Sequence, residues 1–188
     1  YIVSDKLDGN SAMLTLYLQK DNQIKKSLYS RGNGTFGRDI THLLENIYIP
    51  KDTDLVKMFQ KLKVAEITIR GELIISNTNF KKFSDKYSSP RNFVNSVLNS
   101  KDKKAHAQAK FIDYLIFDII EPNQAPEVYF KVLKHFKFKT PGVTAITLTQ
   151  AKQPLFFNKL LDKHRKQSDY EMDGIIVTLN NLNPIPQS

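Results

Sequence analysis

The chain has 188 residues, 40% of them hydrophobic and 11% aromatic, which is enough to bury the core of one domain. Its 28 Lys and Arg against 19 Asp and Glu leave a formal charge of +9, which favours a polyanionic partner such as a nucleic acid or a nucleotide. Cysteine is absent, which excludes disulfides and thiolate metal sites, and only four histidines are present, which argues against a zinc enzyme.

The chain opens on antiparallel β structure. Residues Tyr1–Lys6 lie in an apparent strand without an initiating Met, which indicates a piece of a longer protein, and they lack the features of a signal peptide. Alternating apolar positions predict a strand over 14–18, joined by a turn at 21–22 to a second strand over 24–29. Because no apolar run approaches the length of a membrane span, we expect a soluble, intracellular protein.

A glycine-rich loop and a helix follow. Residues 30–37 hold three of the seven glycines, and residues 40–47 have helical spacing behind a possible cap at Asp39. A loop that leads into a helix suits phosphate binding, since the N–H groups at the helix start face the ligand. Further on we expect helices over 55–62, 126–136 and 154–166, two short helices within 77–104, strands over 66–70, 72–75, 111–120 and 174–179, and an extended tail over 183–186. The elements predict an α+β fold of mostly antiparallel sheets with helices on their outer faces.

Lys6 is the first candidate for chemistry. Lys6-Leu7-Asp8-Gly9 follows an apolar strand, and a lysine held against such a strand is partly desolvated, which favours its neutral amine as a nucleophile. By itself Lys-x-Asp-Gly is a short motif that many surface turns contain, so its significance depends on the rest of the chain.

Other segments carry residues suited to nucleotide chemistry. In the loop Ser30-Arg31-Gly32-Asn33-Gly34-x-x-Gly37-x-Asp39-Ile40-Thr41, glycines let backbone approach a ligand and Arg31 can bind its phosphates. Glu72 places a carboxylate on a predicted strand, and Arg91 offers a forked cation. The segments involved are Arg70-Gly71-Glu72, Ser89-Pro90-Arg91-Asn92 and Asp173-Gly174-Ile175-Ile176-Val177.

In order and approximate spacing, these segments resemble the NAD-dependent DNA ligases over nearly the whole chain. The loop is similar to that family's Arg-Gly-Asp-Gly-x-x-Gly-Glu-Asp-Val-Thr, followed by an Ile-x-Ile-Pro ending at 47–50. The resemblance implies an adenylation (nucleotidyltransferase, ATP-grasp-like) domain over 1–188, from a longer, monomeric ligase that acts on nicked double-stranded DNA. The chain is rich in Lys, Asn and Ile and departs from the family pattern at several positions, which fits a viral or phage branch of the family. We therefore expect the protein to act in the cytoplasm or at a viral replication site.

The resemblance also implies residue roles. Lys6 attacks the α-phosphorus of NAD and expels nicotinamide mononucleotide, AMP passes to the 5′-phosphate at a nick, and the 3′-hydroxyl closes the break. Asp8 and Glu72 assist as catalytic carboxylates, with Glu72 near the ribose and holding Mg²⁺. The positions expected to bind the cofactor are Ser4, Gly9, Arg31, Glu72, Arg91, Arg165, Asp173, Ile176 and Thr178.

Three positions depart from the family pattern. The family has a lysine that touches the adenylate where this chain has Thr178, a glutamate where it has Ser4, and an arginine where it has Asn99. Two alternatives therefore stay open: an ATP-dependent DNA or RNA ligase, and a decayed module that binds nucleotide or DNA without forming the adduct. Lysines over 101–110 and 131–139 either bind the DNA backbone or form solvated helix faces.

Overall fold

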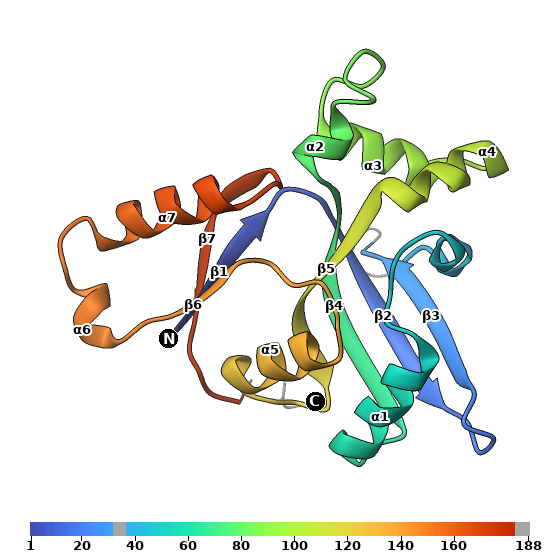
Figure 1. The fold of residues 1–188 in the computed structure, drawn as a ribbon, viewed down its shortest axis with the longest axis horizontal. Coiled ribbons are helices and arrows are strands. Elements are labelled where there is room, and N and C mark those ends of the chain that lie inside the picture. Colours follow the sequence, from blue (N-terminus) through green and yellow to red (C-terminus); the bar gives the residue numbers. More distant parts are fainter. Residues whose placement is uncertain (32–36, 183–188) are drawn as a thin grey trace.

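Two antiparallel sheets form the framework of the molecule (Figure 1), and the computed structural model describes residues 1–31 and 37–182. The larger sheet has the strand order β3-β2-β4-β5, and the smaller has the order β6-β1-β7. All neighbouring strands described in these sheets run antiparallel, which together with the helices confirms the predicted α+β class. Loop residues 32–36 and the predicted tail over 183–186 lie outside the described residues.

The larger sheet contains the hairpin that the alternation predicts. Strand β2 (Asn10–Leu18) pairs with β3 (Ile24–Ser30) on one side and with β4 (Glu66–Ile75) on the other. Strand β5 (Ile112–Glu121) pairs with β4 and completes the sheet. The internal strands are therefore β2 and β4, and both edges of each are hydrogen-bonded to a neighbour.

Gly71 shows where the sequence-based boundaries were wrong. Two strands were expected on either side of this glycine, but β4 runs through it without a break. A Cβ atom at this position would lie 2.5 Å from the carbonyl oxygen of Leu115 on β5. The glycine therefore marks a close approach between two backbones rather than a turn.

The larger sheet has one apolar face, which helices cover, and one polar face. Helices α1 (Asp52–Leu62), α3 (Pro90–Asn99) and α5 (Pro126–His135) share a single core with that apolar face, and they confirm the expected helices there. No helix in the described ranges is both long and apolar enough to span a bilayer. The sheet contributes to the core chiefly through Leu14, Leu16, Ile67, Ile69 and Leu73.

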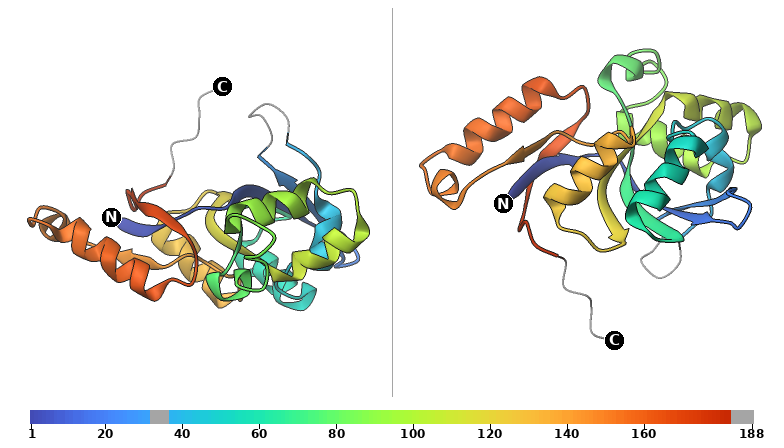
Figure 2. Two further views of the ribbon diagram at one scale, coloured as in Figure 1. Left: turned by 90° about the horizontal axis from the view of Figure 1, so that it is seen from above. Right: turned by 60° about the horizontal axis from the view of Figure 1, so that its bottom comes forward.

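The smaller sheet carries the start of the chain at its centre. Strand β1 (Ile2–Leu7) lies between β6 (Val143–Ala145) and β7 (Met172–Thr178). Helix α7 (Phe156–Gln167) packs on one face of this sheet, and the left view of Figure 2 shows α7 and α1 on the same side of the strands. The small core between α7 and the sheet contains Val3, Ile146 and Leu160.

Strand β7 is an edge strand, although its apolar run was read as a buried one. Ile176 is 42% exposed and Val177 is 46% exposed, and β7 pairs only with β1 among the described strands. An apolar run predicts burial from hydrophobicity alone, whereas burial also requires a neighbour on each face. The prediction of a buried strand was therefore wrong.

The helix expected over 40–47 is reduced to a 3-10 helix, η1 (Thr41–Glu45). Asp39 pairs with Tyr29, and the Ile40 N–H donates to the Leu28 carbonyl, so the backbone is still engaged with β3 at this point. The Asp39 carboxylate does accept from the Thr41 N–H at 2.9 Å. The expected α-helix facing a phosphate is thus absent from this described segment. The other short helices are α2 (Asn77–Phe80), α4 (Lys103–His106), η2 (Ala107–Phe111) and α6 (Leu148–Ala151).

Candidate active site

A cleft of about 1120 Å³ lies where the two sheets meet, because β1 passes directly into β2 through Asp8 and Gly9. Its walls come from both sheets, from the backbone after β3 and from α3. Most of the candidate residues from the sequence lie together in this cleft despite their separation along the chain. They are Lys6, Asp8, Gly9, Arg31, Glu72, Arg91, Asp173 and Ile176.

Lys6 lies within β1, opposite Gly174 of β7, rather than after the strand. Its Nζ donates to Asp173 Oδ2 at 3.1 Å. The side chains of Lys6 and Asp173 are 53% and 50% exposed, so the expected desolvation of the lysine was wrong. The cleft is open to solvent at this point, and a carboxylate on the neighbouring strand positions the amine instead.

Asp8 and Arg91 connect the junction of the sheets to α3. Arg91 Nη1 donates to Asp8 Oδ1 at 2.7 Å. The start of α3 is well defined, since Pro90 occupies its first turn and the Ser89 hydroxyl accepts from the Asn92 N–H. The Ser-Pro-Arg-Asn segment therefore both caps the helix and directs a guanidinium group toward the cleft.

Glu72 lies on the polar face of β4, near the sheet junction. Burial raises the pKa of its carboxyl from 4.5 to about 7, which outweighs the opposite effects of the Gly9 backbone N–H and of the Arg91 and Arg31 charges. A side chain at Gly9 would lie 2.5 Å from the Leu73 carbonyl oxygen, so only glycine permits this approach. The site thus contains a carboxyl group that gains or loses a proton near neutral pH.

Phe117 and Arg70 line the cleft although the sequence did not single them out for it. The β4–β5 register shifts between Arg70, which pairs with Asp118, and Gly71, which pairs with Ile116, so Phe117 is the extra residue of a bulge. The Arg70 guanidinium lies 5.7 Å from the centre of the Phe117 ring and donates to Asp118 at 2.8 Å. A bulge depends on pairing between distant residues, so the apolar run over 111–120 gave no signal for it.

The remaining candidates, Ser4, Arg165 and Thr178, do not line the cleft as described. Ser4 is 7% exposed and is enclosed between β6 and β7, where it pairs with Val143 and Ile176. Arg165 is exposed on α7, and Thr178 pairs with Ile2 at the far end of β7. The structure does not bring these three side chains to the site.

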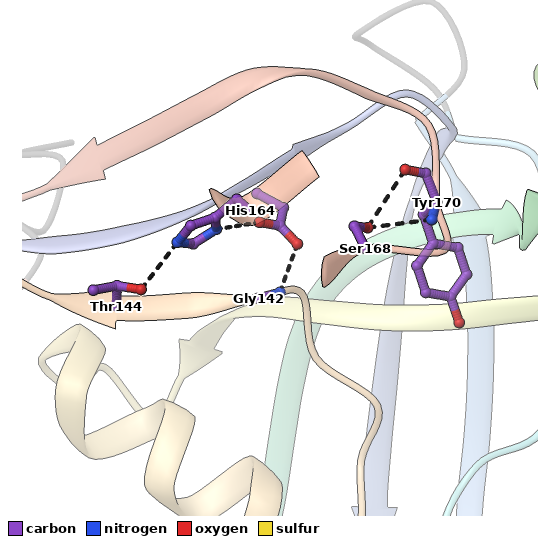
Figure 3. A network of polar contacts seen from close by, with 6 residues as sticks. Gly142, Thr144, His164, Ser168 and Tyr170 are labelled. Carbon is purple, nitrogen blue, oxygen red and sulfur yellow. Dashed lines mark hydrogen bonds and ion pairs between the residues drawn. The ribbon is translucent and has the colours of Figure 1, made fainter. Parts of the chain in front are cut away.

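His164, the residue before Arg165, points into the protein instead. Its Nδ1 lies 2.5 Å from Asp5 Oδ1, and its Nε2 lies 2.9 Å from the Thr144 hydroxyl. Figure 3 shows this network, in which the Gly142 N–H also donates to Asp5 Oδ2 at 2.7 Å. Because Asp5 precedes Lys6 and faces the other side of β1, the network anchors the strand that carries the lysine.

The two basic segments differ in how far their charges are neutralised. Lys131, Lys137 and Lys139 form ion pairs with Glu127, Asp54 and Asp113. Of the two interpretations, these contacts favour a solvated surface for residues 131–139, whose exposed lysines pair with carboxylates of the same chain. Lysines 101, 103 and 104 are exposed, so the segment over 101–110 keeps charge that can meet a polyanion.

Comparisons with known proteins show the family to which the chain belongs. The family described as "NAD-dependent DNA ligase adenylation domain" matches residues 1–187, and the chain belongs to this family. Its relatives include a DNA ligase of Acanthamoeba polyphaga mimivirus, 38% identical over 182 residues, which are 96% of this chain and 26% of that protein. A DNA ligase of Pelagibacter ubique (strain HTCC1062) is 34% identical over 185 residues, covering 97% of this chain and 26% of that protein.

A third relative, a DNA ligase of Aquifex aeolicus (strain VF5), is 28% identical over 193 residues, which cover 96% of this chain and 26% of that protein. The chain therefore spans about a quarter of the length of the curated relatives that it matches. The resemblance drawn from the sequence motifs is confirmed at the level of the family, and viral and bacterial relatives both share it.

Proposed function

We propose that this chain is the adenylation domain of a DNA ligase that uses NAD as its AMP donor, and that Lys6 carries the AMP. The observation that supports this most directly is the position of the Lys6 amine, held at 3.1 Å by Asp173 in a cleft lined by further cations. An amine in such surroundings is placed to attack a phosphorus atom whose oxygens those cations neutralise.

The first step forms one bond and breaks one. The Lys6 nitrogen, after losing a proton, attacks the α-phosphorus of NAD, and the bond from this phosphorus to the bridging oxygen breaks. Nicotinamide mononucleotide leaves with that oxygen, and a phosphoramide joins Lys6 to AMP. Asp173 positions the amine, and Arg31 and Arg91 line the same cleft, where their guanidinium groups would bind phosphate oxygens.

Phe117 supports the binding of the adenine base. Its aromatic ring lies in the cleft, and aromatic faces commonly bind nucleobases by stacking. Ile176 adds an apolar surface on the β7 side of the same cleft. The proposal leaves Ser4, Arg165 and Thr178 without a direct role, since their side chains lie away from it.

In the later steps an oxygen of the 5′-phosphate at a nick attacks the phosphorus of the adenylated lysine, and Lys6 is released. The 3′-hydroxyl then attacks the 5′-phosphorus and expels AMP. We infer that nicked double-stranded DNA reaches the cleft over exposed basic surface such as residues 101–110, and that the protein acts as a monomer.

The residues present fit a Mg²⁺ ion of the kind that phosphoryl transfer uses. Glu72 and Asp8 offer carboxylate oxygens in the cleft, and the Asp8 charge contributes to the raised pKa of Glu72. Within the described residues there is no cluster of three or more side chains suited to a metal. This is compatible with Mg²⁺, which usually binds through one or two carboxylates together with waters and substrate phosphates. When bound, the ion would neutralise charge on those phosphates.

The decisive experiment is the intact mass of the full-length protein after incubation with Mg²⁺ and either NAD or ATP. Wild type is expected to gain the mass of one AMP with NAD, and Lys6→Ala is expected to gain none. Lys163→Ala, which removes an exposed lysine on α7, is the matched control and should behave like wild type.

Two results would overturn the proposal. An adduct formed from ATP alone would make the protein an ATP-dependent ligase. No adduct from either nucleotide would favour a decayed binding module, and the gain of an adduct in Thr178→Lys would then identify the missing lysine as the cause. A robust adduct in wild type would exclude that second alternative.

A further inference from the structure

Arg38 differs from three other cations of the cleft, Lys6, Arg70 and Arg91, in the kind of group that its side chain contacts. Lys6, Arg70 and Arg91 each form an ion pair with a carboxylate, of Asp173, Asp118 and Asp8 respectively. The guanidinium of Arg38 donates to the neutral side-chain oxygen of Asn99 at 2.9 Å. Arg38 forms no ion pair with any residue in 1–31 or 37–182, so no carboxylate in those ranges pairs with its charge.

The backbone around Arg38 is held in place. Its carbonyl accepts from the Ser30 N–H at 3.0 Å, and the next residue, Asp39, pairs with Tyr29 of β3. Gly37 lies so close to β3 that an added Cβ would be 2.6 Å from the Ser30 carbonyl oxygen. Arg38 therefore extends from a fixed point at the end of β3 and reaches the C-terminal end of α3.

Asn99 is likewise oriented for this contact. Its Nδ2 donates to the Asn95 carbonyl at 2.9 Å, which directs its Oδ1 toward Arg38. Arg91, Asn95 and Asn99 follow one another at intervals of four residues along α3 and all line the cleft. Arg91 thus lies at one end of this row, and Arg38 contacts Asn99 at the other end, which is about 12 Å from position 91 along the helix axis from the rise per residue.

The sequence pattern shows the same exchange of charge. In the family pattern described above, a glutamate occupies the loop position of Arg38, and an arginine occupies the position of Asn99 at the end of α3. Here the cation is at position 38 and the partner is an amide, which the structure places in direct contact. Relative to that pattern, this chain carries the cation on the segment after β3 and not at the end of α3, and both positions line the cleft.

We propose that Arg38 binds a phosphate group of the substrate, and that it supplies the positive charge that an arginine at position 99 would otherwise give. The inference rests on the proposed ligase function. A guanidinium whose side-chain partner within the described ranges is a neutral amide suits phosphate, and its contact with the end of α3 opposite Arg91 places it beside a different phosphate. That phosphate belongs either to NAD or to the backbone of the nicked DNA.

The test uses the full-length protein and the variant Arg38→Gln, which can still donate a hydrogen bond to Asn99 but carries no charge. Lys25→Gln is the matched control, because it removes one positive charge from an exposed position on β3, the strand that the Arg38 segment follows. One arm measures the rate of AMP adduct formation against NAD concentration. A second arm measures sealing of a nick whose 5′ end is already adenylated, and a third measures DNA binding against salt concentration.

Arg38→Gln is expected to lower the efficiency of one of the first two arms by about tenfold or more, while Lys25→Gln stays within about twofold of wild type. A higher KM for NAD in adduct formation would assign the phosphate to NAD. Loss in the sealing arm, with a slope of log affinity against log salt that is shallower by about 0.9, assigns it to DNA. Equal effects of the two variants, or no effect of Arg38→Gln, would overturn the proposal.

The exchange of charge has its own test in the variants Arg38→Glu and Arg38→Glu/Asn99→Arg. The double variant is expected to recover most of the activity that the single variant loses. Equal loss of activity in both variants would show that a cation at position 99 does not replace one at position 38. If wild type forms no adduct, the ligase proposal fails by itself, and the salt dependence of DNA binding still decides whether Arg38 binds phosphate.

Discussion

Asp5 and His164 form a buried contact in which Asp5 Oδ1 lies 2.5 Å from His164 Nδ1, and it joins the central strand of the smaller sheet to α7. The two side chains are only 5% and 4% exposed. Since side chains alternate along a strand, Asp5 is directed away from the face that presents Lys6. The contact fixes β1 to α7 on one face of the strand, while Lys6 on the opposite face lies in the cleft.

Replacing His164 with Ala should therefore destabilise the fold strongly. It leaves the Asp5 carboxylate buried with the Gly142 N–H as its remaining described partner, and loss of one member of a buried pair costs about 3–5 kcal/mol. Urea unfolding followed by circular dichroism measures this free energy. Arg165→Ala on the exposed face of the same helix should change it by less than about 0.5 kcal/mol. A His164→Ala protein as stable as this control would show that the network is dispensable.

Glu72 should make the stability depend on pH. Burial raises the pKa of Glu72 from 4.5 to about 7, so between these values the folded state binds more protons than the unfolded state. The stability of wild type therefore falls as pH rises through this window, whereas Glu72→Gln loses this dependence. Above pH 7 we expect Glu72→Gln to be more stable than wild type by roughly 1–2 kcal/mol, a figure reduced for partial exposure.

Denaturant unfolding at a series of pH values between 4 and 8 measures this difference. Adduct formation should show the opposite tendency, because the ionised carboxylate is the form that holds a cation. Activity of wild type should rise with pH through about 7, and Glu72→Gln should be impaired throughout. If the difference in stability between wild type and Glu72→Gln did not change with pH, the raised pKa of Glu72 would be contradicted.

Phe117 should contribute to the binding of NAD through its ring. Phe117→Ala is expected to raise the KM for NAD in adduct formation by about tenfold, because stacking of a base on an aromatic ring is worth about 1–3 kcal/mol. Phe117→Tyr retains the aromatic face and should stay close to wild type. Equal impairment of the two variants would assign Phe117 to packing of the bulge instead.

Gly71 and Gly174 both lie in strands, but only Gly71 packs closely against a neighbouring backbone, so Gly174 serves as its control. Alanine at Gly71 would meet the Leu115 carbonyl at 2.5 Å, whereas alanine at Gly174 would have no described atom within 4 Å. Gly71→Ala should lower the free energy of unfolding by about 1–3 kcal/mol, because it forces β4 and β5 apart, and Gly174→Ala should leave it nearly unchanged. Urea midpoints that do not differ would show that the sheet adjusts without cost.

Local sequence determined much of this protein. The alternation over 14–18 and 24–29 gave the β2–β3 hairpin, the periodicity over 55–62, 126–136 and 154–166 gave α1, α5 and α7, and Ser89-Pro90 marked the start of α3. These features depend on residues that are neighbours in the chain. Side-chain alternation, helical spacing and capping all act over a few positions, so the sequence is enough to read them.

The tertiary structure decided what depends on partners far along the chain. It continued β4 through Gly71, left β7 exposed, placed Phe117 at a bulge, and turned His164 rather than Arg165 inward. It also brought Arg38 to Asn99, 61 positions later in the chain. Exposure, register and charge pairing are set by which elements pack together, and that packing is a property of the whole fold rather than of any short segment.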